Sequence, residues 1–282
     1  MKGIILAGGN GTRLRPLTNA TSKQLLPIYD KPLIFYPLSS LMELGIKDIA
    51  LIVKSKEKDS FFSLLGDGKK FGVEITYLIQ DEPNGLAEAF IIAEKFIGTS
   101  NVTLILGDNI FYGDALKNSL SEKFTHGAKI FCCKVNDPER YGVAKVSGEK
   151  VIEIIEKPNE FISDFAVTGI YVYDNSVIKK SKALVPSKRG ELEITDLNNL
   201  YIQEGKLRGT FLDPEMIWMD TGTFESLHDA SSLVKALQSR TGHLIGSPEF
   251  IAYQNGWVKK NQLIKNIDLK NPYDKSLAFS LS

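Results

Sequence analysis

The 282-residue sequence has only two cysteines, and no apolar run approaches the roughly 20 residues that a membrane-spanning helix requires. Cys132 and Cys133 are neighbours, a spacing that suits neither an ordinary disulfide nor a zinc site. We therefore interpret both as reduced packing residues. The first residues lead directly into a strand-like segment without a signal-peptide pattern, so we expect a cytoplasmic protein with no membrane partner.

An excess of charge of either sign is also missing, because 34 basic side chains face 34 acidic ones. Such a balance gives no overall field to hold a nucleic-acid backbone, and we expect no nucleic-acid partner. The three histidines, His126, His228 and His243, are scattered outside any motif, which argues against a histidine base. What is present is 43% apolar and 24% charged residues, typical of a globular protein with a sizeable core.

The first half of the chain alternates two kinds of apolar segment. Short continuous runs predict buried strands, and segments with apolar residues every three or four positions predict helices. The predicted strands are 3–7, 48–53, 74–80, 102–107 and 128–135, and the predicted helices are 33–44, 86–96 and 115–124. This alternation predicts an α/β fold with a doubly wound, mostly parallel central sheet.

After Asn136 the pattern becomes rich in strands, which predicts an inserted substrate-side subdomain over about 136–210. Here we predict strands at 142–146, 151–156 and 167–173 and helices at 175–184 and 194–204. A further strand is predicted at 211–219, and Thr223 is a good N-cap for a helix reaching Gln238. We therefore divide the chain into a domain over 1–240 and a short helical tail over 241–282.

A glycine-rich loop follows the first strand, at the sheet edge where open α/β folds bind ligands. Gly8, Gly9 and Gly11 let backbone N–H groups face a phosphate, and Arg13, Arg15 and Lys23 add positive charge. A dinucleotide fingerprint would need glycine where Leu14 stands, and the ending of a P-loop is missing. The pattern indicates a polyphosphate site, with a tight turn bearing solvated basic residues as the alternative.

Two acids end predicted strands, and they are candidates for a metal site. Asp108 follows strand 102–107 at the same sheet edge as the glycine loop, and Asp220 follows strand 211–219. Mg²⁺ typically takes one or two carboxylates and completes its shell with phosphate oxygens and water. Taken alone, each aspartate is better explained as a turn residue or a helix cap than as a metal ligand.

Two further segments carry polar groups at strand ends. Glu156 and Lys157 stand before Pro158 and can point into a cleft, although such a pair is commonly a surface ion pair. Gln80 ends another predicted strand, and its amide offers both a donor and an acceptor to the edge of a pyrimidine. A polar residue that merely begins a loop is the alternative for Gln80.

These motifs together resemble the sugar-1-phosphate nucleotidyltransferase family, over residues 1 to about 240. The matching blocks are 6–14 (LAGGNGTRL), 22–27 (SKQLLP), 106–109 (LGDN), 137–143 (DPERYGV), 156–158 (EKP), 166–169 (AVTG), 189–196 (RGELEITD) and 218–222 (WMDTG). Several ordered blocks are far more specific than a glycine loop alone. The resemblance implies a Rossmann-like nucleotidyltransferase fold whose inserted subdomain binds a sugar.

The match is nearest to the branch of the family that joins dTTP and glucose 1-phosphate. The resemblance thus implies attack of a glucose 1-phosphate oxygen on the α-phosphorus of dTTP, which yields dTDP-glucose and pyrophosphate with Mg²⁺ as cofactor. It also implies a homotetramer, a place in dTDP-rhamnose biosynthesis and feedback by dTDP-rhamnose. A uridylyl- or cytidylyltransferase, a non-catalytic sugar-nucleotide sensor and, less favoured by the missing glycine, a nicotinamide-linked oxidoreductase remain as alternatives.

The resemblance also implies roles for individual residues. Arg13, Lys23 and Lys157 would be catalytic, and Asp108 and Asp220 would hold Mg²⁺. The nucleotide would contact Gly8, Gly9, Gly11, Thr12, Arg13, Lys23, Gln24, Gln80, Pro83, Gly85 and Asp108. The sugar phosphate would contact Asn109, Tyr141, Gly142, Glu156, Lys157, Val167, Thr168, Tyr171 and Trp218. The chain departs from the expected pattern at Asn10, where serine is common, and at Glu88, where we expect glutamine; the second departure leaves thymine against uracil open.

Overall fold

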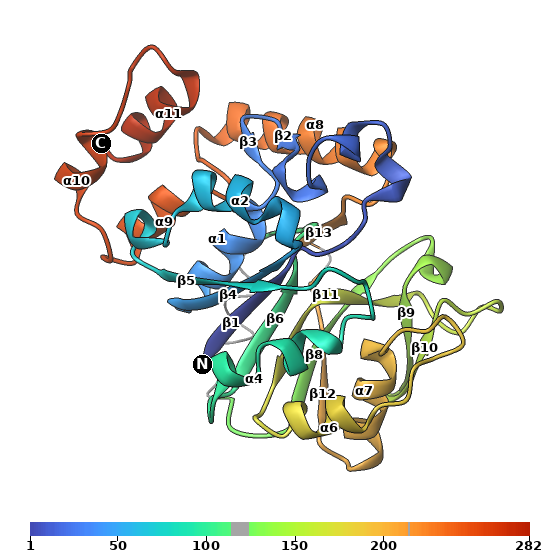
Figure 1. Cartoon of the computed structure of the whole chain (residues 1–282). Coiled ribbons are helices and arrows are strands. Elements are labelled where there is room, and N and C mark those ends of the chain that lie inside the picture. The colour runs from blue at the N-terminus through green and yellow to red at the C-terminus, as the bar shows by residue number, and fades with distance from the viewer. Residues whose placement is uncertain (114–123, 214) are drawn as a thin grey trace.

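The computed structural model describes residues 1–113, 124–213 and 215–282, and one large sheet runs through its centre (Figure 1). Seven strands follow one another in the order β10-β9-β11-β6-β1-β4-β5, while β8 pairs with β11 and β12. The strands are β1 (Lys2–Leu6), β4 (Asp48–Val53), β5 (Glu74–Ile79), β6 (Val102–Leu106), β8 (Ala128–Lys134), β9 (Gly142–Ser147), β10 (Lys150–Glu156), β11 (Phe165–Tyr173) and β12 (Leu207–Phe211).

The N-terminal half of the sheet is parallel, since β1 pairs in parallel with both β4 and β6, and β4 with β5. Its middle strands consist of buried apolar residues because helices cover both faces, which confirms the predicted α/β fold class. Strand β11 is antiparallel to β6 and continues past it to pair with β8 and β9. This long strand therefore joins the parallel half of the sheet to the antiparallel hairpin β9–β10.

The helices of the first 240 residues largely follow the sequence pattern. They are α1 (Phe35–Glu43), α2 (Lys58–Leu65), α3 (Glu88–Ile92), α4 (Glu94–Ile97), α6 (Val177–Ala183), α7 (Ile194–Gln203) and α8 (Phe224–Thr241). The single helix predicted over 86–96 is wrong in detail, because the chain breaks at Ala93 into the two short helices α3 and α4. Helix α2 was not predicted, and the helix predicted over 115–124 lies almost wholly outside the described residues.

The strand predicted over 211–219 is also wrong, because it is two strands in two different sheets. Strand β12 ends at Phe211 beside β8, whereas β13 (Ile217–Asp220) pairs with the unpredicted strand β7 (Asn109–Tyr112). Asp213 turns the chain between them: its side chain accepts a hydrogen bond from the Glu215 N–H and its carbonyl accepts one from Met216. This turn lets β13 pair with β7, which sets Asp220 opposite Asn109.

The residues after 241 form three helices, α9 (Pro248–Gln254), α10 (Lys260–Ile264) and α11 (Pro272–Ser280). Apolar side chains such as Ile251 and Leu277 join the same core as α1 and the parallel strands, and α9 packs on α1. Figure 1 shows these helices at one end of the molecule and the hairpin β9–β10 with α7 at the other. The division into domains stays a prediction.

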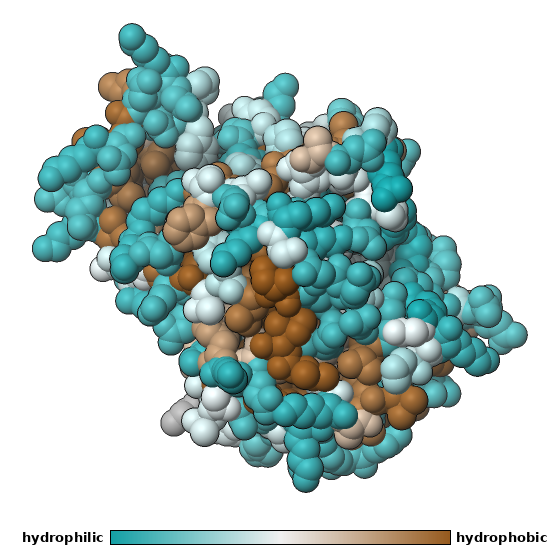
Figure 2. Space-filling view, in the orientation of Figure 1, coloured by the Kyte–Doolittle hydropathy of each residue, from teal (hydrophilic) through white to brown (hydrophobic). Residues whose placement is uncertain are grey.

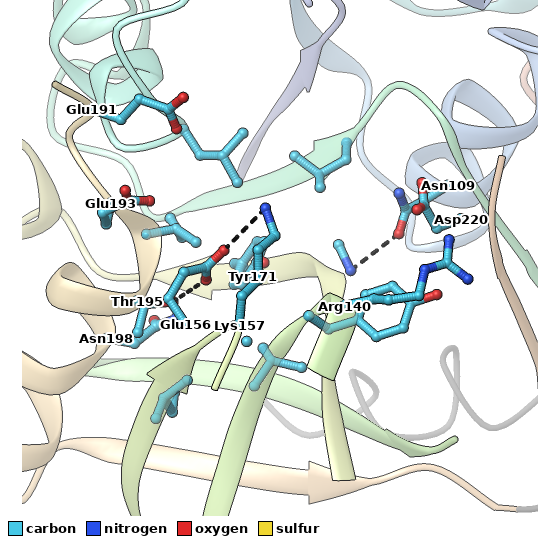
Figure 3. Close-up of a pocket in the computed structure, with 18 of the residues that line it drawn as sticks. Asn109, Arg140, Glu156, Lys157, Tyr171, Glu191, Glu193, Thr195, Asn198 and Asp220 are labelled. Carbon is cyan, nitrogen blue, oxygen red and sulfur yellow. Dashed lines mark hydrogen bonds and ion pairs between the residues drawn. The ribbon is translucent and has the colours of Figure 1, made fainter. Parts of the chain in front are cut away.

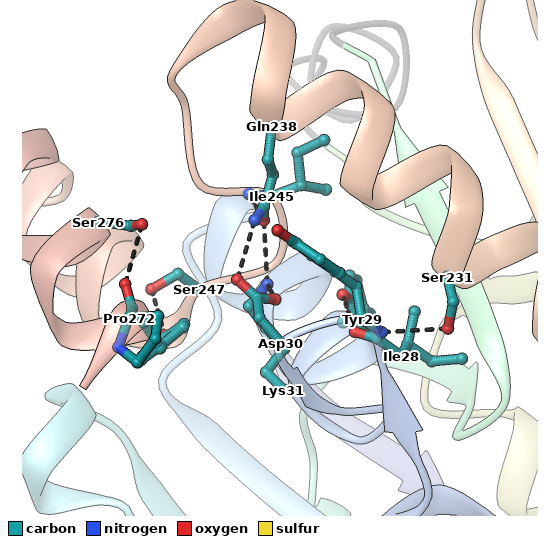
Figure 4. Close-up of polar contacts among 12 residues, drawn as sticks. Ile28, Tyr29, Asp30, Lys31, Ser231, Gln238, Ile245, Ser247, Pro272 and Ser276 are labelled. Carbon is teal, nitrogen blue, oxygen red and sulfur yellow. Dashed lines mark hydrogen bonds and ion pairs between the residues drawn. The ribbon is translucent and has the colours of Figure 1, made fainter.

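A buried polar junction ties this end together (Figure 4). Lys31, in the small hairpin of β2 (Pro27–Ile28) and β3 (Lys31–Pro32), lies 2.5 Å from Asp30 and 3.1 Å from the Gln238 oxygen on α8. Gln238 in turn donates to Asp30 and accepts from the Ile245 N–H. The junction anchors the segment after the glycine loop to α8, the helix that follows Asp220.

The surface seen in Figure 2 is mainly hydrophilic, with apolar side chains gathered over the end of β5 and the helical segment that follows it. Ile79, for example, is 39% exposed at this end of β5. Among the described residues, no helix has the length and apolar character needed to cross a membrane. Both cysteines are free and burial raises the pKa of each thiol, which confirms their interpretation as reduced packing residues.

Candidate active site

The glycine loop leaves the end of β1 and is held by its own backbone. Gly11 has a φ of 58°, which glycine adopts without strain, and its carbonyl accepts hydrogen bonds from the Thr18 hydroxyl and the Leu14 N–H. The short turn Thr12–Leu14 buries Leu14 completely. Arg13, between these anchors, is left exposed and lines a cavity beside the loop.

The two aspartates, 112 positions apart in the chain, meet through the sheet β7–β13. Asp220 stands opposite Asn109 in this antiparallel register, and the Asp108 carbonyl accepts hydrogen bonds from the Thr221 N–H at 3.1 Å and hydroxyl at 2.8 Å. A Cβ atom placed on Gly222 would lie 3.0 Å from the Asp220 carboxylate and 3.3 Å from the Arg13 guanidinium. The glycine loop and both acids therefore share one place.

The charges at this place are strongly coupled. Lys23, buried in the second pass of the loop, forms an ion pair with Asp108. Burial alone would raise the pKa of Asp108, but the charge and hydrogen bond of Lys23 hold that pKa below its ordinary value. Burial and the negative charge of Asp108 raise the pKa of Asp220, an effect that the nearby cations offset only in part.

Asn109 is the centre of the hydrogen bonds beside these acids. Its side-chain oxygen accepts the Trp218 indole N–H at 2.6 Å and the Gly169 N–H at 3.1 Å, while its amide nitrogen donates to Asp108 at 3.0 Å. The Tyr141 ring lies against Trp218, with centroids 5.0 Å apart. Asn109, 2% exposed, thus holds β11, β13 and the first aspartate in one arrangement.

The opposite end of the cavity carries a second charged cluster (Figure 3). Glu156 ends β10, accepts a hydrogen bond from the Thr195 hydroxyl at 2.8 Å and lies 3.6 Å from the Lys157 ammonium. Lys157 has a φ of 43°, an uncommon backbone conformation for a residue with a Cβ atom. Arg189 lies 3.5 Å from Glu156, so two cations face this part of the cavity.

Glu193 fixes the position of Arg189. The guanidinium makes two hydrogen bonds to the Glu193 carboxylate, at 3.0 and 2.7 Å, and Ser187 adds a third at 2.7 Å. Burial alone would raise the pKa of Glu193, but these hydrogen bonds and the arginine charge lower it overall. The Arg189 guanidinium is therefore fixed in position by its ion pair with Glu193.

A cavity of about 320 Å³ joins the two clusters. Of the predicted site residues, it is lined by Arg13, Asp108, Asn109, Tyr141, Gly142, Glu156, Lys157, Val167, Tyr171, Trp218 and Asp220. The remaining predicted residues do not line it: Gly8, Gly9, Gly11, Thr12, Lys23, Gln24, Gln80, Pro83, Gly85 and Thr168. Among the described residues that line this cavity there is no histidine, in agreement with the expectation from the sequence.

Three of those remaining residues are buried or closely packed. Thr168 stands between Val167 and Gly169, which line the cavity, and its fully buried hydroxyl has no hydrogen-bond partner among the described residues. Gln24 is buried, and its side chain accepts a hydrogen bond from Ser22 at 2.7 Å. Gly85 has a φ of 109° and packs on Leu192, where a Cβ atom would fall 2.4 Å from the carbonyl oxygen.

A smaller polar cavity of about 130 Å³ lies on the other side of the glycine loop. Gly9, Lys23 and Lys54 line it, together with other polar residues. Lys54, which follows β4, is only 8% exposed and donates a hydrogen bond to the Asn10 side chain in the loop. This buried ammonium group adds positive charge beside the glycine loop, and it belongs to a residue to which the sequence analysis gave no role.

Sequence reasoning missed several residues that line the main cavity. Arg140, Arg189, Glu191, Glu193 and Thr195 stand inside the blocks that carry the resemblance, so the motifs themselves offered a signal. Leu86 and Asn198 also line it but belong to no such block. Asn198 lies on the helix α7, and only the packing of that helix on β10 brings it to the site.

The donor set fits a hard divalent cation held together with phosphate. In the described ranges, no group of three or more His, Cys, Asp or Glu side chains is arranged to hold a metal ion by itself. The adjacent pair Asp108 and Asp220, whose mutual repulsion raises one pKa, is instead suited to a cation that completes its shell with phosphate oxygens and water.

Comparisons with known proteins agree with this geometry. The Nucleotidyl transferase family matches residues 2–236. A glucose-1-phosphate thymidylyltransferase of Neisseria meningitidis is 50% identical, with 98% of each chain covered, and one of Mycolicibacterium smegmatis is 48% identical, with 93% of this chain and 92% of that one covered.

Solved structures show the same fold. A Bacillus anthracis protein assigned as a glucose-1-phosphate thymidylyltransferase, in complex with sucrose, superposes with a TM-score of 0.78 at 45% identity, covering 83% of this chain and 94% of that one. A UDP-glucose pyrophosphorylase complexed with UDP-glucose superposes with a TM-score of 0.74 at 24% identity, covering 84% of this chain and 98% of that one. At that identity the second likeness concerns the fold alone.

Proposed function

The chain belongs to the nucleotidyl transferase family, among its glucose-1-phosphate thymidylyltransferases, and on this premise we propose that it transfers a thymidylyl group from dTTP to glucose 1-phosphate. The products are dTDP-glucose and pyrophosphate. The observation that carries the proposal is the cavity in which Arg13, Asp108 and Asp220 lie at one end and Lys157 at the other. It offers a place for a triphosphate and a separate place for a sugar phosphate.

At the sugar end, Lys157 and Arg189 hold the phosphate of glucose 1-phosphate by their charge. Glu156 accepts a hydrogen bond from a sugar hydroxyl with the carboxylate oxygen that Thr195 leaves free. A sugar phosphate is ionised near neutral pH, so its oxygen attacks phosphorus without a general base. Catalysis then rests on orientation of the two substrates and on neutralisation of charge.

At the nucleotide end, the backbone of the glycine loop and Arg13 neutralise charge that grows on the transferred phosphoryl group and the leaving pyrophosphate. Lys23 holds the region of the α-phosphate and balances Asp108. Mg²⁺, held by Asp108 and Asp220, would act as a Lewis acid on the phosphate oxygens. Gln80 reads the edge of the base with its amide.

The finer features of the proposal rest on the kinship with relatives about 50% identical over nearly the full length. They are a homotetramer, a cytoplasmic location and a role in dTDP-rhamnose biosynthesis with feedback by dTDP-rhamnose. Light scattering during size-exclusion chromatography measures the first. Inhibition of turnover by added dTDP-rhamnose measures the last.

A substrate panel tests the proposed activity. Glucose 1-phosphate and related sugar phosphates are each mixed with dTTP, UTP, CTP and ATP in the presence of Mg²⁺, and pyrophosphate release is recorded. We expect the largest kcat/KM with dTTP and glucose 1-phosphate; preference for UTP or CTP would establish the alternative transferase, and binding without pyrophosphate a sensor. Lys157→Met should lower kcat/KM by about 100-fold or more, whereas Lys150→Met, an exposed control at the start of β10, should leave it unchanged.

A further inference from the structure

Gln80, which is buried, and Glu88, which is half-buried, form a hydrogen-bonded pair at the edge of the nucleotide end. Gln80 follows β5 and is 6% exposed; its amide nitrogen donates a 2.6 Å hydrogen bond to the Glu88 carboxylate at the start of α3. The second carboxylate oxygen of Glu88 accepts a hydrogen bond from Asn84 at 2.9 Å. Both oxygens of Glu88 are therefore engaged, and its carboxylate holds the loop between β5 and α3.

We propose that Glu88 is a positioning residue that sets base preference by fixing the orientation of the Gln80 amide. An ionised carboxylate only accepts hydrogen bonds, so the amide nitrogen of Gln80 must face Glu88. The amide oxygen must then face away, and it lies 3.0 Å from the position that a Cβ atom on Gly8 would occupy in the glycine loop. A glutamine at position 88 would be both donor and acceptor and would tolerate either orientation of Gln80.

With its orientation fixed, the Gln80 amide complements the hydrogen-bonding pattern of thymine and uracil but not that of cytosine. Thymine and uracil carry an N3–H donor beside the O4 acceptor, so the Gln80 oxygen accepts from N3 while its second N–H donates to O4. Cytosine has the reverse pattern, an N3 acceptor beside an amino donor, and would place acceptor against acceptor and donor against donor. Rejection of an analogue with unmatched polar groups is strong in a buried site.

The inference rests on the proposed function and sharpens it in one direction. The hydrogen bonds of Gln80 are the same for thymine and uracil, because these bases share the N3–H and O4 groups and differ only by the C5 methyl group. Glu88 therefore separates both from cytosine and leaves the choice between them to other contacts. The acid at position 88, an apparent departure from the expected sequence, strengthens the preference for dTTP over dCTP.

The test compares kcat/KM for dTTP, dUTP and dCTP, each with glucose 1-phosphate, in the unchanged enzyme and in Glu88→Gln. We expect the preference for dTTP over dCTP to fall about tenfold in the variant, the size expected when one hydrogen-bonding constraint is lost. The preference for dTTP over dUTP should stay the same. A purely structural role would lower all three values together and would leave both preferences unchanged.

Three further variants complete the experiment. Glu88→Asp keeps an acceptor-only side chain and should keep the preference over dCTP even if turnover falls; Glu88→Ala removes the constraint without adding an amide and should lose that preference if Glu88→Gln does not fold. Glu82→Gln makes the same charge change on an exposed side chain of the same loop and serves as the control. Its ratios should equal those of the unchanged enzyme.

The outcomes separate this inference from the proposed function. If the unchanged enzyme releases no pyrophosphate with any combination of triphosphate and sugar phosphate, the proposed function fails. If it turns over dTTP, but the preference over dCTP is absent or survives within twofold in both Glu88→Gln and Glu88→Ala, the role of Glu88 is overturned while the activity stands.

Discussion

Removal of the Asn109 side chain should destabilise the protein more than any single surface change, because one buried amide makes three hydrogen bonds there. In Asn109→Ala the Trp218 indole N–H and the Gly169 N–H lose their acceptor, and Asp108 loses a donor. A neutral hydrogen bond contributes about 1 kcal/mol, and one to a charged group about 2 kcal/mol. The expected fall in the free energy of unfolding is therefore about 4 kcal/mol, a large part of the roughly 5–15 kcal/mol of a typical domain.

Urea unfolding followed by tryptophan fluorescence measures this fall, with Asn101→Ala as the matched control. Among the described residues, the Asn101 amide donates two long hydrogen bonds of 3.4 Å, to the carbonyls of Phe124 and Thr125, so its loss should cost less than about 1 kcal/mol. Equal losses for the two variants, or a loss under about 1 kcal/mol for Asn109→Ala, would refute the view that this amide organises the site.

Four more predictions follow from the site and its surroundings. Arg13→Ala should lower kcat about 100-fold or more with little change in the KM of dTTP, since charge neutralisation matters most in the transition state; steady-state kinetics with normal turnover would contradict it. Lys54→Met should raise the KM of dTTP and leave kcat nearly unchanged, because this buried cation contacts the loop and not the reacting groups; an unaltered KM would exclude that role. Removal of divalent metal with EDTA should stop pyrophosphate release, and added Mg²⁺ should restore it; activity that persists in EDTA would rule out the metal site. Burial alone would raise the pKa of Asp174, but hydrogen bonds from Ser176, Gly127 and Tyr201 lower it below 3.8. As the pH falls, the Asp174 carboxylate is therefore protonated more readily in the unfolded chain than in the folded one, so acid should lower the free energy of unfolding. In Asp174→Asn, urea unfolding between about pH 3 and 6 should show a weaker dependence of this free energy on pH. An identical pH dependence in both proteins would contradict the role of Asp174.

The parallel half of the sheet could be predicted because its signal is local. A strand such as β4 is a short run of apolar residues between polar segments, and that pattern persists whatever the neighbouring strand is. The same local signal misled over 211–219, where the apolar residues 211–212 and 216–219 were joined across the polar turn at Asp213, although they lie in two different sheets. Helix α2 and strand β7 were missed because both are short: α2 has eight residues, half of them polar, and β7 has four.

Residue types and their order along the chain determined which groups were available: a glycine loop with cations, acids at strand ends, and an amide before a turn. Whether these groups meet depends on contacts between segments about 100 residues apart, which no local pattern contains. The register that sets Asp220 opposite Asn109 brought the two acids together, and the packing of α7 on β10 added Thr195 and Asn198. Only tertiary structure decided that Glu88 would meet Gln80, because the chain must turn between β5 and α3 for their side chains to touch.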